Sequence, residues 1–197
     1  MKTPEDFHRE NVKEIFKKRL KDKTIKLNPL SIKIEESNLT DETSVDFSFE
    51  RHVGKRKKIY SFQEKKGSGF VDAVFTTCYN SFIEEYKSLR NLSLVDLIVK
   101  PIFSVSRDSK GSDAKTDIIF RLETKDHGRA EFSSRSRSIV YSSYTVTLEA
   151  FQFYMNCDKT YRKLKDVLED AQGRNRPDIA AHCISDLSTL AEINTYV

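Results

Sequence analysis

Residues 66–86 contain the clearest structural signal in the chain: Lys-Gly-Ser-Gly-Phe-Val-Asp-Ala, then Val-Phe-Thr-Thr-Cys-Tyr-Asn-Ser-Phe-Ile-Glu-Glu-Tyr. A Gly-x-Gly loop leads into apolar residues at three- and four-residue spacing, which predicts an amphipathic helix with one buried face. The first N–H groups of a helix lack partners within it and carry partial positive charge, so a carboxylate or phosphate can bind there. An ordinary glycine-rich turn before a core helix has the same pattern. The apolar positions are Val71, Val74, Phe75, Cys78, Tyr79, Phe82, Ile83 and Tyr86.

Three strand-like segments precede this helix. Residues 30–34 and 45–49 alternate apolar and polar side chains, and residues 57–63 do so more weakly. Turn-forming residues separate the segments, so we expect an antiparallel sheet with one buried and one solvated face. Thr3-Pro4 followed by two acids is a typical helix start, which predicts a charged helix through residue 21.

The second half of the chain repeats this order. Alternating segments are again followed by a helix, and apolar positions of the two helices align. One β-β-β-α unit cannot close a core, whereas two copies can, and four copies in a homodimer do so more fully. The expected strands are residues 94–105, 117–122 and 130–134, and the expected helix is 138–156. The aligned positions are Phe70 with Ile139, Phe75 with Tyr144, and Phe82 with Phe151.

The predicted fold class is therefore α+β, with two βββα units forming a compact pseudo-symmetric domain and extra N- and C-terminal helices. The extension is expected to hold two helices, one starting near Thr160 and one near Pro177. The expected divisions are an N-terminal helix (1–26), a central domain (27–156) with repeat units 27–89 and 92–156, and a C-terminal helical extension (157–197).

The composition favours a single domain and argues against a membrane or disulfide-rich protein. The 197 residues, 38% hydrophobic and 32% charged, suit one domain with a modest core. No apolar run approaches the roughly 20 residues of a membrane span, and the charged N-terminus is unlike a signal peptide. Cys78, Cys157 and Cys183 are widely separated, which favours a cytoplasmic, reducing compartment over a disulfide framework or zinc site.

The sequence contains no recognisable catalytic motif. The four histidines lie apart, and neither a Gly-x-Ser-x-Gly elbow nor a Walker loop occurs, so we expect no catalytic residues, no metal and no cofactor. Cys78 falls on the apolar stripe and is expected in the core. Asp72 falls in the first helical turn, where capping alone accounts for a carboxylate. Asp113 follows Gly111-Ser112 in a comparable loop.

Basic residues cluster at 13–26, 51–58 and 129–137, although the net charge is only +4. Such clusters can bind nucleic acid, and the order helix, three strands, helix over residues 3–86 resembles a double-stranded-RNA domain. That domain has lysines where its second helix starts, whereas residues 69–72 are acidic and apolar. The many acids favour solvated faces, so nucleic-acid binding is the least favoured function.

Residues 67–73 resemble the Gly-x-Gly-Pro-Val-Asp-Ala motif of a known family, with Phe70 in place of the proline. The family is the C-terminal regulatory (allosteric, dimerisation) domain of 2-isopropylmalate synthases and the related citramalate synthases. Its Leu-x-Asp-Tyr and Gly-x-Asp-Ala motifs correspond to residues 94–97 and 111–114, and its second helix start to residues 138–143. The resemblance covers residues 27–156.

This resemblance implies a homodimer that binds a branched-chain amino acid effector, leucine or isoleucine, near the glycine loop and the dimer interface. The effector carboxylate would meet the N–H groups of residues 69–71, and Asp72 or Asp113 would face its ammonium. Leu94 and Leu97 would line the side-chain pocket. The implied effector-binding residues are Gly67, Gly69, Phe70, Val71, Asp72, Ala73, Leu94, Leu97, Gly111, Asp113 and Ala114.

The catalytic (β/α)8 barrel of these synthases needs about 250 residues, for which this chain has no room. We therefore expect a non-catalytic regulatory module, either free-standing or severed from its enzyme. A catalytic protein is a candidate binding partner. The alternative is a protein-interaction or assembly module without an effector, in which the charged terminal helices dock a partner.

Overall fold

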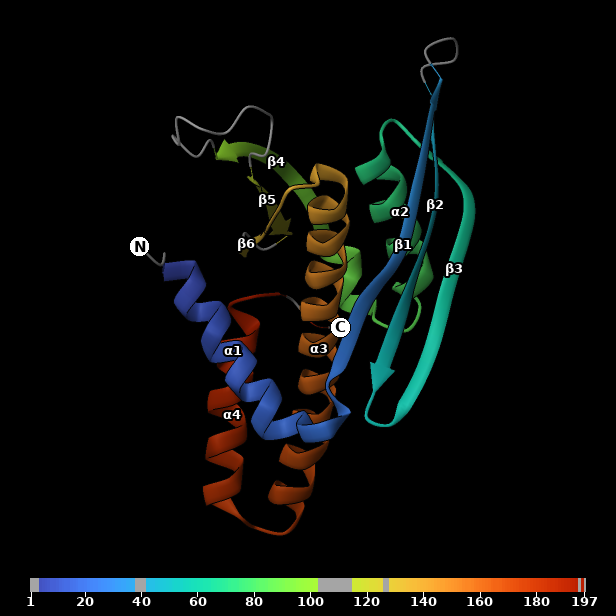
Figure 1. Ribbon diagram of the computed structural model, residues 1–197. Helices are drawn as coiled ribbons and strands as arrows, with labels where there is room; N and C mark the ends of the chain where they lie inside the picture. The colour runs from blue at the N-terminus through green and yellow to red at the C-terminus, as the bar shows by residue number, and fades with distance from the viewer. Residues whose placement is uncertain (1–3, 38–41, 103–114, 126–127, 195, 197) are drawn as a thin grey trace.

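The computed structural model describes residues 4–37, 42–102, 115–125, 128–194 and 196. It contains two three-stranded antiparallel sheets, each followed by a helix, with one helix before them and another after them (Figure 1). The predicted α+β class, with two βββα units and extra terminal helices, is confirmed. The first unit holds β1 (Ile25–Ser37), β2 (Glu42–Val53), β3 (Arg56–Gly67) and α2 (Phe70–Phe82). The second holds β4 (Leu92–Ile102), β5 (Lys115–Thr124), β6 (Arg129–Ser136) and α3 (Ile139–Gly173), and the outer helices are α1 (Pro4–Leu20) and α4 (Pro177–Ala191).

Helix α3 lies between the two sheets and joins them into one core (Figure 1). It packs against β1 on one side and against β5 and β6 on the other, while α2 covers β2 and β3 and lies beside α3. Phe151 of α3 is fully buried and contacts Phe75 and Phe82 of α2, with ring centroids 5.0 and 6.4 Å away. Each unit therefore completes its core with residues of the other, as the repeat predicts.

The two units share details beyond the order of their elements. The first strand of each carries a bulge against the second strand, at Leu30 in β1 and at Val95 in β4. The side chains at both bulges are exposed, with 54% of the surface of Leu30 and 52% of the surface of Val95 accessible to solvent. On the opposite, buried face the second and third strands of each sheet pair aromatic residues, Phe47 with Phe62 and Phe120 with Phe132.

Helix α3 is continuous, so the predicted helix end at Asn156 and new start near Thr160 are wrong. Asn and Asp are poor helix formers, but here tertiary contacts outweigh that preference. The side chain of Asn156 accepts from the N–H of Ile25 (2.8 Å) and donates to its carbonyl (2.9 Å). Asp158 accepts from the hydroxyl and N–H of Ser88 (2.6 and 3.2 Å). The expected boundary of the central domain therefore lies inside a helix.

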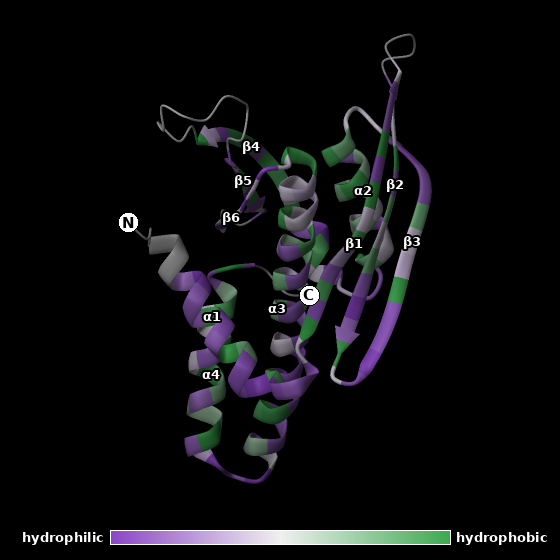
Figure 2. Ribbon diagram, viewed as in Figure 1, coloured by the Kyte–Doolittle hydropathy of each residue, from purple (hydrophilic) through white to green (hydrophobic). Residues whose placement is uncertain are grey.

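The terminal helices pack on their own chain. Helix α1 is largely hydrophilic (Figure 2). It nevertheless buries Val12, Phe16 and Leu20, and it packs on α3 and β6. The predicted break after Gly173 is confirmed, because α3 ends there and α4 begins at Pro177 and folds back along α3. Over the described residues, no helix combines the length and apolar character that crossing a membrane requires.

Candidate functional site

The two glycines at the junction of β3 and α2 have different surroundings: Gly67 ends β3, and Gly69 immediately precedes α2. A Cβ added to Gly67 would lie 2.6 Å from the backbone nitrogen of Ala73, so no side chain fits between loop and helix. A Cβ added to Gly69 would meet nothing within 4 Å. Neither residue has a positive φ. Gly67 is therefore required for close packing, and Gly69 occupies an open position at the start of α2.

The first turn of α2 presents free amides beside a carboxylate. The N–H of Ala73 makes the first helical bond, to the carbonyl of Gly69 (3.0 Å), so the N–H groups of residues 70–72 have no partner within the helix. Asp72 accepts from the N–H of Ser68 (3.1 Å) and from its hydroxyl (3.3 Å). Asp72 lies in the first turn of α2, as expected, but it accepts from the loop residue Ser68 rather than from a helix N–H, and its side chain remains exposed.

An open cavity of about 680 Å³ separates this part of α2 from the start of β4. Its volume lies within the range of about 300–1,000 Å³ that is usual for small-molecule sites. The apolar wall comes from three residues of the α2 stripe and two of β4, and the rim is polar. The apolar lining residues are Val71, Phe75, Tyr79, Leu92 and Leu94; the polar rim comprises Ser68, Gly69, Asp72, Thr76, Asn80 and Ser93.

The structure brings together part of the expected effector set. Four of those residues line the cavity, although a helix and a turn separate them in sequence: Gly69, Val71, Asp72 and Leu94. Others lie elsewhere: Gly67 and Ala73 pack against each other, Phe70 packs partly buried against the core, and Leu97 lies farther along β4 with 40% of its surface exposed. Gly111, Asp113 and Ala114 lie outside the described residues.

Sequence reasoning assigned two lining residues, Phe75 and Tyr79, only to the core. Both are half-buried, and with Val71 they form a ridge at four-residue spacing beside the fully buried positions Val74 and Cys78. The sequence feature that could have predicted their place in the cavity lining is the width of the apolar stripe, which exceeds what packing against one sheet requires. The outer ridge of α2 therefore packs against the edge of the core and also lines the cavity.

The cysteine of α2 does not line the cavity. Cys78 is fully buried and burial raises the pKa of its thiol far above the usual range, so it is a core residue, as expected. Within the described ranges no group of histidine, cysteine and carboxylate side chains is placed to hold a metal ion. Compared with models of known protein families and with curated proteins, the sequence matches none.

Proposed function

We propose that this chain is a non-catalytic regulatory module that forms a homodimer and binds a branched-chain amino acid, leucine or isoleucine. The proposal follows the resemblance of residues 27–156 to the regulatory domain of 2-isopropylmalate and citramalate synthases. The observation that carries it is the cavity between α2 and β4. There the glycine loop, an exposed carboxylate and an apolar wall meet in a space that suits a small ligand.

The chemistry of the cavity matches the three parts of such an amino acid. A ligand carboxylate suits the free amides of residues 70–72, which the helix dipole makes electropositive. The ammonium on the next carbon suits Asp72, and the branched side chain suits Val71, Phe75 and Leu94. Burial of a leucine-sized side chain contributes about 1.5–3 kcal/mol. With one or two charge-assisted hydrogen bonds, this supports a Kd of ~1 mM or tighter.

The homodimer is supported by a difference between the two units. Ile32 and Ile34 of β1 lie opposite β2 on the buried face and pack, partly buried, against the core. The equivalent residues of β4 are Leu97 and Val99, and they are 40% and 44% exposed. Helix α3 covers β1, whereas β4 has no comparable cover from the described part of the chain. A second copy would bury this apolar strand face.

Titration calorimetry with leucine, isoleucine and valine tests the effector. We expect saturable heat with leucine or isoleucine, weakened at least about tenfold by Asp72→Asn, which removes the charge that faces the ammonium. Asp178→Asn is the matched control, because Asp178 is an exposed aspartate in the first turn of α4, remote in sequence from the cavity residues. Absence of heat with all three amino acids at millimolar concentration would refute effector binding and leave dimerisation to be judged separately by sedimentation.

A further inference from the structure

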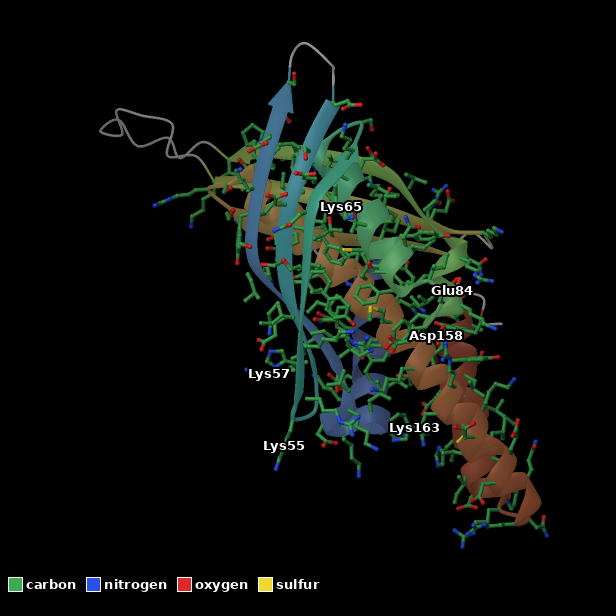
Figure 3. The ribbon with its side chains drawn as sticks, turned by 90° about the vertical axis from the view of Figure 1, so that its right-hand side faces the viewer. Lys55, Lys57, Lys65, Glu84, Asp158 and Lys163 are labelled. Carbon is green, nitrogen blue, oxygen red and sulfur yellow. The ribbon has the colours of Figure 1, made fainter. Side chains whose placement is uncertain are left out.

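A second, larger cavity of about 780 Å³ lies at the other end of β3 from the glycine loop. It is bounded by the β2–β3 hairpin and by the middle of α3. In Figure 3, Lys55 and Lys57 mark the hairpin, Lys163 lies across from them on α3, and Lys65 marks the far end of β3. This cleft shares no lining residue with the cavity between α2 and β4.

The cleft concentrates the positive charge of the chain. Seven basic and two acidic side chains line it, a formal charge of +5 compared with +4 for the whole protein. The basic cluster of residues 51–58, expected to be a solvated face, therefore faces three further cations as well as two acids. The basic lining residues are Arg51, Arg56, Lys57, Lys58, Lys159, Arg162 and Lys163, and the acidic ones are Glu85 and Asp166.

Some of these cations have carboxylate partners. Arg51 forms a two-pronged ion pair with Glu85, with N–O distances of 2.8 and 2.7 Å, and Arg162 pairs with Asp158 at 2.6 Å. Lys57 lies 3.4 Å from Glu50. Four lining cations form no ion pair with a carboxylate of the described chain: Arg56, Lys58, Lys159 and Lys163.

Two of the unpaired lysines are held in place by backbone carbonyls. Lys159 donates to the carbonyl of Lys23 (2.7 Å), and Lys163 donates to that of Arg19. An ammonium has three N–H donors, so each lysine keeps two for a ligand. Burial, followed by the nearby charge of Arg51, lowers the pKa of Lys159. A bound anion would relieve this crowding of positive charges.

The shape and the aromatic residues of the cleft favour a compact ligand. Tyr86 is buried and Tyr60 half-buried in its lining, and the ammonium of Lys58 lies 4.7 Å from the ring centroid of Tyr60. The cations converge from β3 and α3 on one concavity, whereas a nucleic-acid surface follows a backbone whose charges repeat along its length. Guanidinium and ammonium groups in such a concavity are well suited to phosphate oxygens.

We propose that this cleft binds a compact polyanion carrying two or more phosphate groups, the chemistry shared by inorganic polyphosphates and nucleoside polyphosphates. The proposal does not depend on the amino acid site. Binding of tripolyphosphate and of ATP to the full chain, measured by calorimetry, separates the two sources. Equal affinities indicate that the phosphates alone are recognised, and tighter ATP binding indicates that a tyrosine also contacts the nucleoside.

The variant Lys58→Gln/Lys163→Gln removes one cation from each wall, and we expect it to weaken tripolyphosphate binding at least about tenfold. Lys100→Gln/Lys125→Gln, in β4 and in the turn after β5, is the charge-matched control, with an expected change within about twofold. Lys57→Gln/Lys58→Gln, exposed on β3, replaces the first variant if loss of the Lys163 contact impairs folding.

A third variant separates ligand binding from a structural role. Glu85→Gln removes the carboxylate that occupies Arg51, so tripolyphosphate binding should become tighter, whereas mere damage to the cleft could only weaken it. Three results would overturn the proposal. These are no saturable binding at millimolar tripolyphosphate, equal affinity in the cleft and control variants, and tighter binding of single-stranded RNA or an acidic peptide than of tripolyphosphate.

Discussion

Replacing Gly67 by alanine should destabilise the protein substantially, although the substitution adds only one methyl group, at the half-buried last residue of β3. The new Cβ would lie 2.6 Å from the backbone nitrogen of Ala73, 2.9 Å from its Cα and 2.9 Å from a carboxylate oxygen of Asp72. The backbone of a helix cannot move aside as the end of a flexible side chain can. The end of β3 and the residues that follow it must therefore move away from α2. Overpacking of this kind costs about 1–3 kcal/mol. In a chain of this length each kcal/mol corresponds to about 2–4 °C, so Tm should fall by about 2–12 °C.

Gly69→Ala is the matched control, two residues along the chain at the same junction of β3 and α2. Its Cβ would meet nothing within 4 Å, and its φ of −173° is extended backbone that any residue adopts. Alanine is a poorer N-cap than glycine but restricts the unfolded chain, so the two effects offset each other to within about 0.5 kcal/mol. Thermal and urea unfolding of both variants measures the difference. Equal effects of the two substitutions, or a neutral Gly67→Ala, would refute the inferred close packing.

Three further predictions concern the core, the carboxyl of Glu149 and the dimer. Asn156→Ala should lower the free energy of unfolding in urea by about 1–3 kcal/mol, because the N–H and carbonyl of Ile25 lose their partner. Partial desolvation raises the pKa of Glu149, an exposed residue of α3, despite its basic neighbours, so the stability of the folded protein decreases as pH rises from about 4.5 through the raised pKa. Glu149→Gln should therefore unfold at higher urea than the parent at pH 7 but not at pH 4. Val99→Lys should sediment as a monomer with unchanged circular dichroism, since its side chain is 44% exposed.

The architecture of the units was accessible from sequence because it depends on local patterns. Alternation in residues 30–34 and 45–49 and the helical spacing after Gly69 report burial directly. The correspondence of the strands was harder to see, because the connections differ in length: four residues separate β1 from β2 and twelve separate β4 from β5. The equivalence of the bulges at Leu30 and Val95 appears only from the strand pairing.

The continuity of α3 and the basic cleft depend on contacts between distant segments. The sequence near Asn156 gives no sign that its side chain will form hydrogen bonds with the backbone of Ile25, which lies 131 positions away. Likewise, Lys159 and Lys163 lie outside the basic cluster of residues 51–58, and only the fold brings them to it. Sequence patterns identify buried faces well, but they cannot pair polar groups across the chain.

The uncovered face of β4 links the two parts of the proposed function. Leu94 lines the cavity between α2 and β4, the proposed amino acid site, and Leu97, on the same face of the same strand, is exposed where the partner is proposed to pack. A partner that covers Leu97 would adjoin the open side of the cavity, so occupancy of one site changes the surroundings of the other. Linkage then requires leucine to tighten dimerisation by the same factor by which dimerisation tightens leucine binding. Sedimentation with and without leucine and calorimetry at two protein concentrations measure these two factors independently, and a factor of one in both measurements would exclude a cavity shared with the interface.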